Sequence, residues 1–111
     1  MAVGYGVIKI YNNLIENVGN DGTAQGQESI LCDDRITGPE VNPKQQMMIY
    51  NNVIKNPMPK GGIRVGAYNN NSLTATITDN QLWIPNAASN WEYYYVACNA
   101  PKIQTGNTVV R

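Results

Sequence analysis

Four acidic residues and one arginine are the groups in this chain best suited to acid–base chemistry. Asp33 and Asp34 are adjacent, with Glu28 shortly before them, and Arg64 and Glu92 lie farther along. Two carboxyl groups at a suitable separation can hydrolyse a glycosidic bond. Their oxygens could also hold Ca²⁺. Because neighbouring strand residues point to opposite faces, Asp33 and Asp34 share a site only if Asp34 lies in a bend. The simpler hypothesis is that the pair ends a strand and begins a turn.

Several other chemistries are excluded by what the chain lacks. It has no histidine, so it holds neither a Ser-His-Asp triad nor a histidine-bound zinc site. Gly61 and Gly62 lie between a proline-rich loop and an expected strand, which is not the context of a phosphate-binding loop before a helix. We therefore expect no cofactor, with calcium at the Asp33–Asp34 site as the one metal left open.

A repeated segment must position these groups. Residues 10–17 (IYNNLIEN) and 49–56 (IYNNVIKN) share six of eight residues, and residues 77–84 (ITDNQLWI) are a weaker copy. A fourth copy, residues 103–110 (IQTGNTVV), fits with one residue inserted. The asparagines of the four copies form one column, Asn13, Asn52, Asn80 and Asn107, with steps of 39, 28 and 27 residues. Self-similarity at such a period predicts stacked repeats.

The pattern between the repeats predicts short strands and little or no helix. Apolar alternation and β-branched residues predict strands near 3–11, 14–16, 29–33, 46–50, 53–55, 62–66, 73–78, 81–84 and 93–98. Loops rich in Gly, Pro and Asn separate them, and residues 85–92 are expected to be one of these loops. The fold class predicted is all-β, a parallel β-solenoid of three to four coils forming one domain over residues 1–111. The bend asparagines should hydrogen-bond up the stack as a ladder, although asparagine also favours independent turns.

Two rows of side chains should face outward from this stack. One row is Tyr11, Tyr50 and Thr78, and the other is Glu16, Lys55 and Trp83. The simpler hypothesis is that these pairs stabilise the sheets, by about 0.2–1 kcal/mol per pair. The functional hypothesis is a sugar-binding face, with aromatic rings to stack on a pyranose and charged groups to bind its hydroxyls or carboxylates. Trp91, beside Glu92, is a further candidate for carbohydrate binding.

The motif apolar-x-Asn-Asn-apolar-apolar-x-Asn, followed about ten residues later by Gly62-Ile63-Arg64-Val65, resembles the right-handed parallel β-helix of the pectate-lyase-like superfamily. The resemblance covers nearly the whole chain. It implies a fold shared by polysaccharide lyases, glycoside hydrolases, epimerases and bacteriophage tailspikes, whose members typically have many more coils. Lyases of that superfamily use an arginine base and acidic Ca²⁺ ligands, but no lyase motif is matched here residue by residue.

Composition restricts the partners. The net charge is zero, with eight basic and eight acidic residues and 16 asparagines. Without a basic patch, we expect no nucleic-acid partner. The sequence has no apolar run long enough to span a membrane and no segment resembling a signal peptide, so we expect no membrane partner. Cys32 and Cys98 occupy equivalent positions two repeats apart, at about 10 Å, which exceeds the reach of a disulfide. We therefore predict two buried free thiols.

The ends of a short solenoid expose backbone and core. We therefore expect either a segment of a longer β-helix or self-association through the ends, with a homotrimer as one form. Three functional hypotheses remain. The first is recognition of a polysaccharide by a tailspike-like or cell-surface protein, which would place the chain outside the cell or on a virion surface. The second is a catalytic β-helix using Asp33, Asp34, Arg64 or Glu92, and the third is a structural stalk or filament module.

Overall fold

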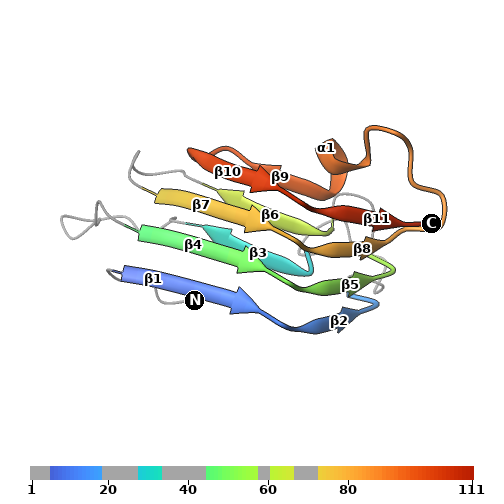
Figure 1. Ribbon diagram of the computed structural model, residues 1–111, viewed down its shortest axis with the longest axis horizontal. Helices are drawn as coiled ribbons and strands as arrows, with labels where there is room; N and C mark the ends of the chain where they lie inside the picture. Colours follow the sequence, from blue (N-terminus) through green and yellow to red (C-terminus); the bar gives the residue numbers. More distant parts are fainter. Residues whose placement is uncertain (1–5, 19–27, 34–44, 58–60, 67–72) are drawn as a thin grey trace.

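The computed structural model describes residues 6–18, 28–33, 45–57, 61–66 and 73–111. These residues form an all-β structure with one short helix (Figure 1). In chain order the elements are β1 (Gly6–Tyr11), β2 (Leu14–Glu16), β3 (Ile30–Asp33), β4 (Gln45–Tyr50), β5 (Val53–Lys55), β6 (Ile63–Gly66), β7 (Leu73–Thr78), β8 (Gln81–Trp83), α1 (Trp91–Tyr95), β9 (Val96–Cys98), β10 (Lys102–Thr105) and β11 (Thr108–Val110). None of the described residues forms a helix long and apolar enough to cross a membrane.

The strands form three parallel sheets that are built in the same order. Sheet A is β1-β4-β7-β10, sheet B is β2-β5-β8-β11 and sheet C is β3-β6-β9. We call the strands at one level a rung, so that β1, β2 and β3 make the first rung and β10 and β11 the fourth. The register pairs Ile10 with Ile49 and Ile49 with Ile77. Parallel sheets stacked in repeat register are compatible with the predicted solenoid.

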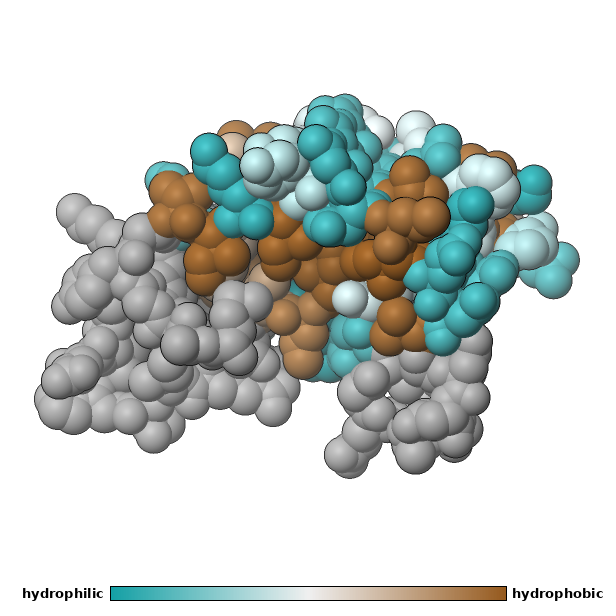
Figure 2. All heavy atoms as spheres, turned by 90° about the horizontal axis from the view of Figure 1, so that it is seen from below, coloured by the Kyte–Doolittle hydropathy of each residue, from teal (hydrophilic) through white to brown (hydrophobic). Residues whose placement is uncertain are grey.

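The core follows from alternation along each strand. In β7, Leu73, Ala75 and Ile77 are buried and the residues between them are more exposed, because successive side chains point to opposite faces. Ile49, Ile54, Ile77 and Leu82 are completely buried and belong to one hydrophobic cluster. Removing this apolar surface from water is the main force that holds the rungs together. At the β1–β2 end of the stack, apolar side chains lie across the middle of the visible face (Figure 2).

Each passage from sheet A to sheet B is a two-residue bend. Its first residue has positive φ in every rung, at Asn12 (57°), Asn51 (53°), Asp79 (57°) and Gly106 (71°). Asn, Asp and Gly are the residues that adopt this left-handed region most readily. The second residue of each bend therefore leaves the turn in the same direction in every rung.

That neighbouring column is the asparagine ladder predicted from the sequence, and the structure confirms it. Asn13 Nδ2 donates to Asn52 Oδ1 (3.0 Å), Asn52 Nδ2 to Asn80 Oδ1 (2.9 Å) and Asn80 Nδ2 to Asn107 Oδ1 (2.9 Å). The backbone N–H of each donor residue points to the same acceptor, at 3.1–3.2 Å. Asn52 and Asn80 are fully buried, so their polar groups must be satisfied within the protein. The ladder satisfies them and fixes the register.

The register corrects the expected insertion in the fourth copy. Gln104 pairs with Ile77 and Thr105 with Thr78, so no residue is inserted. Gln104 takes the core-facing column, and Ile103 points outward with 61% of its surface exposed. The physical reason is that the Asn80–Asn107 bonds set the register from the bend and override the apolar match of Ile103 to the isoleucine column.

The strand expected at residues 93–98 is also corrected, because only Val96–Cys98 is a strand. Residues 91–95 form α1, a single helical turn or so in which the Val96 N–H bonds to the Glu92 carbonyl. Trp91 and Tyr95, four residues apart, both pack against the core, while Tyr93 is 80% exposed. Helical spacing places both rings on one face, and this packing decides against the strand.

Neither Cys32 nor Cys98 forms a disulfide, as predicted, and both residues pair with Val65 from opposite sides. Cys32 is buried, but Cys98 is only half-buried, which corrects the expectation of two buried thiols. The reason is its position in β9, which is the last strand of sheet C among the described residues.

Candidate functional site

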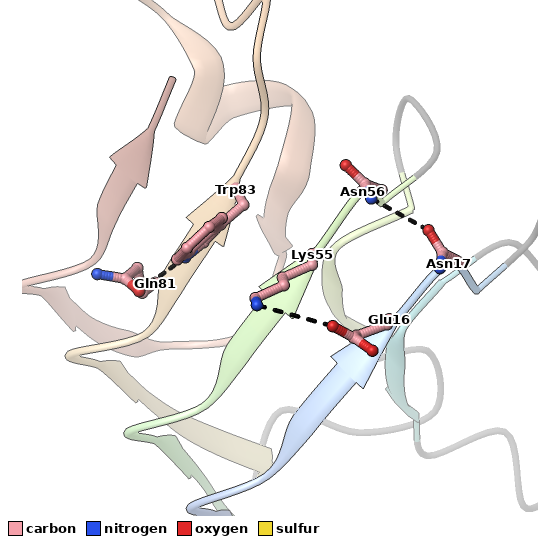
Figure 3. Close-up of polar contacts among 6 residues, drawn as sticks. All are labelled: Glu16, Asn17, Lys55, Asn56, Gln81 and Trp83. Carbon is pink, nitrogen blue, oxygen red and sulfur yellow. Dashed lines mark hydrogen bonds and ion pairs between the residues drawn. The ribbon is translucent and has the colours of Figure 1, made fainter.

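The outer face of sheet B carries the predicted row of Glu16, Lys55 and Trp83, which the register confirms. In each three-residue strand the middle side chain (Ile15, Ile54 or Leu82) points to the core, so its neighbours face outward. Lys55 Nζ lies 3.7 Å from Glu16 Oε1 and 4.3 Å from the centroid of the Trp83 ring. Figure 3 shows the Lys55–Glu16 ion pair as a dashed line, with the Trp83 side chain on the neighbouring strand.

The side chains of this row contact one another and their neighbours on the outer face of sheet B. Lys55 is shared by an ion pair and a cation–π contact, each of which contributes modestly at a surface. The Trp83 indole N–H donates to Gln81 Oε1 at 2.7 Å. At the strand ends, Asn56 Nδ2 donates to Asn17 Oδ1 at 3.1 Å. These contacts between neighbouring strands stabilise sheet B. Trp83, which is 39% exposed, is the ring it leaves available to a ligand.

The other outward row begins with Tyr11 and Tyr50. Their rings are parallel within 2°, with centroids 5.0 Å apart. One face of each ring is therefore occupied by the other, and the pair stabilises the edge of sheet A. Tyr11 remains 47% exposed, so part of its surface is open to a partner.

A concave surface lies elsewhere, between α1 and the ends of β6, β9 and β10. We call it the α1 groove. Its volume is about 1010 Å³. The polar and aromatic side chains that line it include Arg64, Glu92, Tyr93, Tyr94, Lys102 and Gln104.

The α1 groove combines two cations with two rings. The Tyr93 and Tyr94 rings meet edge to face, 5.2 Å apart at 88°, which leaves ring surface facing solvent. Lys102 Nζ donates to the Cys98 carbonyl at 3.1 Å, and Arg64 Nη1 lies 3.2 Å from Glu28 Oε1. Both contacts hold a positively charged side chain at the wall of the groove, and cations of this kind bind acidic or hydroxyl-rich groups.

Glu92 is the acidic side chain among the described lining residues, and two amides bind it. Its Oε1 accepts from Gln104 Nε2 at 2.9 Å and from Asn107 Nδ2 at 3.4 Å. Asn107 is the last asparagine of the ladder, so Glu92 takes the place that the next ladder amide would fill. This carboxylate thus binds the last amide of the ladder and also lines the groove.

The structure brings only some of the catalytic candidates together. Arg64 and Glu92 line the same groove. The backbone of Asp33 ends β3 and pairs with Gly66, while Asp34 lies outside the described residues, so the Asp33–Asp34 site stays a prediction. The described residues contain no cluster of three or more potential metal ligands. Trp91 is half-buried and packs against the core, and its role in binding also stays a prediction.

Sequence reasoning missed Tyr93, Tyr94 and Lys102 as lining residues. The run Tyr93-Tyr94-Tyr95 was assigned to a strand, which would have turned neighbouring rings to opposite faces. A signal was present in Asn90, because asparagine commonly precedes a helix, and in the spacing of Trp91 and Tyr95. Lys102 was hidden by the one-residue error in the fourth repeat.

Comparison with models of known protein families, with curated proteins and with solved structures finds no match to this chain. Its function must therefore be argued from the site itself.

Proposed function

We propose that this chain is a segment of a right-handed parallel β-helix that recognises a polysaccharide, in the manner of a tailspike or another surface-binding protein outside the cell. The observation that carries the proposal is the α1 groove, where Tyr93 and Tyr94 stand beside Arg64 and Lys102. Sugar-binding sites combine an apolar ring face with convergent polar donors, as ligand sites generally do. The two cations favour a saccharide that bears carboxylate, sulfate or phosphate groups.

Binding is supported better than hydrolysis. A glycoside hydrolase needs two carboxyl groups flanking the scissile bond, and the described lining of the groove contributes Glu92 alone, already bound to Gln104 and Asn107. The alternative of a lyase is favoured by one observation, the presence of Arg64 in the groove, because lyases of the superfamily that the sequence resembles use an arginine base. An absorbance assay for unsaturated products on every glycan that binds tests this alternative.

The proposal is tested by a glycan array probed with the intact chain, followed by titration of the best ligand against two matched variants. Tyr93→Ala removes an 80% exposed ring in the groove, so the fold should be unaffected while affinity falls about tenfold. Tyr11→Ala removes a ring from the other surface and should leave affinity unchanged. If Tyr11→Ala or Trp83→Ala abolishes binding and Tyr93→Ala does not, the site lies on the outer rows and the groove assignment is wrong. An array with no bound glycan overturns the proposed function.

A further inference from the structure

The shape of the α1 groove depends on where α1 is held against the stack. Three consecutive lining residues, 92–94, belong to this helix. The Glu92 carboxylate fastens α1 to the fourth rung, by accepting from Gln104 and Asn107. At its other end α1 stops at Tyr95, and the chain continues directly into β9, which pairs with β6. The helix is therefore held from two sides.

Gly62 lies against the end of α1. In sheet C, Ile63 pairs with Val96, so the residues before them, Gly62 and Tyr95, occupy one column. Gly62 is buried, and a Cβ added to it would overlap the backbone carbonyl oxygen of Tyr95. Glycine is the residue that permits so close an approach of two backbone segments. With α1 in its present place, no larger residue fits at this position.

The same column carries a side chain in the first rung. Ser29 precedes Ile30, which pairs with Ile63. The N–H groups of Ser29 and Ile30 donate to the carbonyls of Gly61 and Gly62 in the second rung. The segment next to Ser29 is not helical, and a serine is accommodated there. The glycine is needed in the second rung, where the neighbouring segment is the end of a helix.

Two groups crowd this position, and they differ in how easily they move. Leu82 Cδ2 would lie 3.1 Å from the added carbon, but this methyl ends a side chain that has rotational freedom. The Tyr95 carbonyl belongs to the backbone. It is fixed by α1 before it and by the pairing of Val96 with Ile63 after it. An added carbon at Gly62 therefore displaces the C-terminal end of α1.

We propose that Gly62 is a positioning residue for the α1 groove. Its missing side chain lets the Tyr95 carbonyl lie against the start of β6, and this contact sets the place of the helix. The place of the helix in turn keeps Glu92 in reach of its two amide partners and holds Tyr93 and Tyr94 at the groove. The seat of α1 follows from the backbone contact alone, and its effect on ligand binding rests on the proposed function.

Gly62→Ala tests the seat of α1 without a ligand. In ¹⁵N spectra, the side-chain amide signals of Gln104 and Asn107 should move from their wild-type positions, because their bonds to Glu92 are lost. The matched control is Ile63→Val, which removes one methylene from a buried neighbour in β6 and should lower stability while leaving these signals in place. Circular dichroism establishes that both variants are folded. Unmoved amide signals in the Gly62→Ala variant overturn the proposal.

A double-mutant cycle determines whether Gly62 acts through α1. Glu92→Ala should lower the urea midpoint of the wild-type chain but hardly lower that of Gly62→Ala, because the bonds it removes are already broken. Additive shifts would overturn the proposal. If Gly62→Ala does not fold, the reciprocal measurement decides. Glu92→Ala should then shift the backbone ¹⁵N signals of Gly62 and Tyr95 but not those of β2, and an unmoved Gly62 signal contradicts the proposal.

The effect on binding is measured by anisotropy with fluorescein-labelled heparin, a saccharide that bears carboxylate and sulfate groups. The wild-type chain and Ile63→Val should bind it equally, and Gly62→Ala about tenfold more weakly. Equal affinity in all three, with the amide signals displaced in Gly62→Ala, would show that the seat of α1 does not position a binding site. Failure of the wild-type chain to bind contradicts the proposed function, whereas unmoved amide signals contradict the role of Gly62, so the two failures are distinguished.

Discussion

The two ends of the ladder are built from the same repeat but treat its last hydrogen bonds differently. At the fourth rung, Glu92 accepts from the Asn107 amide and from Gln104. At the first rung, Asn13 keeps an acceptor to which no described residue donates. The last side-chain amide of the ladder therefore has an acceptor within the chain, whereas the first ladder oxygen has no donor among the described residues.

The core-facing side chains of sheet A also differ between the two ends of the stack. The positions held by Ile8 and Ile10 in the first rung are held by Lys102 and Gln104 in the fourth. Lys102 is exposed and bonds to the Cys98 carbonyl. Among the described residues, the inward column of sheet A is therefore apolar at the first rung and polar at the fourth. Two substitutions in this column distinguish the fourth rung from the first.

The largest loss of stability should come from replacing an asparagine in the middle of the ladder. The losses at the two ends are compared with this value. Asn80→Ala removes an amide that bonds to Asn52, Asn107 and the Ile49 carbonyl while fully buried. Leaving these partners unsatisfied should lower the free energy of unfolding by about 3 kcal/mol or more. Urea denaturation followed by circular dichroism measures it, with the exposed Asn86→Ala as control, expected within about 0.5 kcal/mol of the wild type. A cost below about 1 kcal/mol would mean that the ladder does not hold the rungs.

The next largest loss of stability should come from Glu92, which binds the last amide of the ladder. Glu92→Ala removes the acceptor for Gln104 and Asn107 and should cost about 2 kcal/mol, because hydrogen bonds to a charged group are the stronger class. Glu92→Gln keeps a carbonyl oxygen in place and should lose less than half as much in the same urea measurement. Equal losses in the two variants would show that the negative charge, and not the acceptor, closes this end.

The open end should tolerate the same change better than the middle. Asn13→Ala removes one side-chain bond to Asn52 and one to Tyr11 at an exposed site, so the expected cost is about 1 kcal/mol. The stability losses of Asn13→Ala and Asn80→Ala are measured under the same conditions. The difference between them reports how much less completely the first asparagine is hydrogen-bonded than an interior one. Equal costs at Asn13 and Asn80 would show that the first rung is covered and would end the contrast between the two ends.

The smallest effect should come from the charged row on sheet B. Glu16→Gln removes the 3.7 Å ion pair with Lys55 and should cost less than about 0.5 kcal/mol, since Glu16 is exposed and Lys55 only half-buried, so solvent screens the pair. Repeating the urea titration in about 1 M salt should reduce the difference further, because the Debye length falls to about 3 Å. A cost that persists in salt would assign the Glu16 effect to packing.

The sequence predicted the parts of this protein that repetition encodes. The steps between Asn13, Asn52, Asn80 and Asn107 predicted parallel stacking, the ladder and the outward rows, because identical positions in stacked strands must lie one above another. The separation of Cys32 and Cys98 by two rungs followed from the same column argument. Among the site residues, Arg64 and Glu92 were selected by type, and the structure places both in one groove.

The sequence did not predict the structure of the segments that depart from the repeat. Residues 91–95 form a helix because Trp91 and Tyr95 both find the core, and no local pattern shows that contact in advance. Gln104 occupies an isoleucine position because Asn107 bonds to Asn80 across 27 residues, and its neighbour Glu92 was assigned to a loop. The repeat alone determined the stacking. The bonds of Glu92 to Gln104 and Asn107, and the groove beside them, were decided by contacts between residues far apart in the chain, which only the tertiary structure brings together.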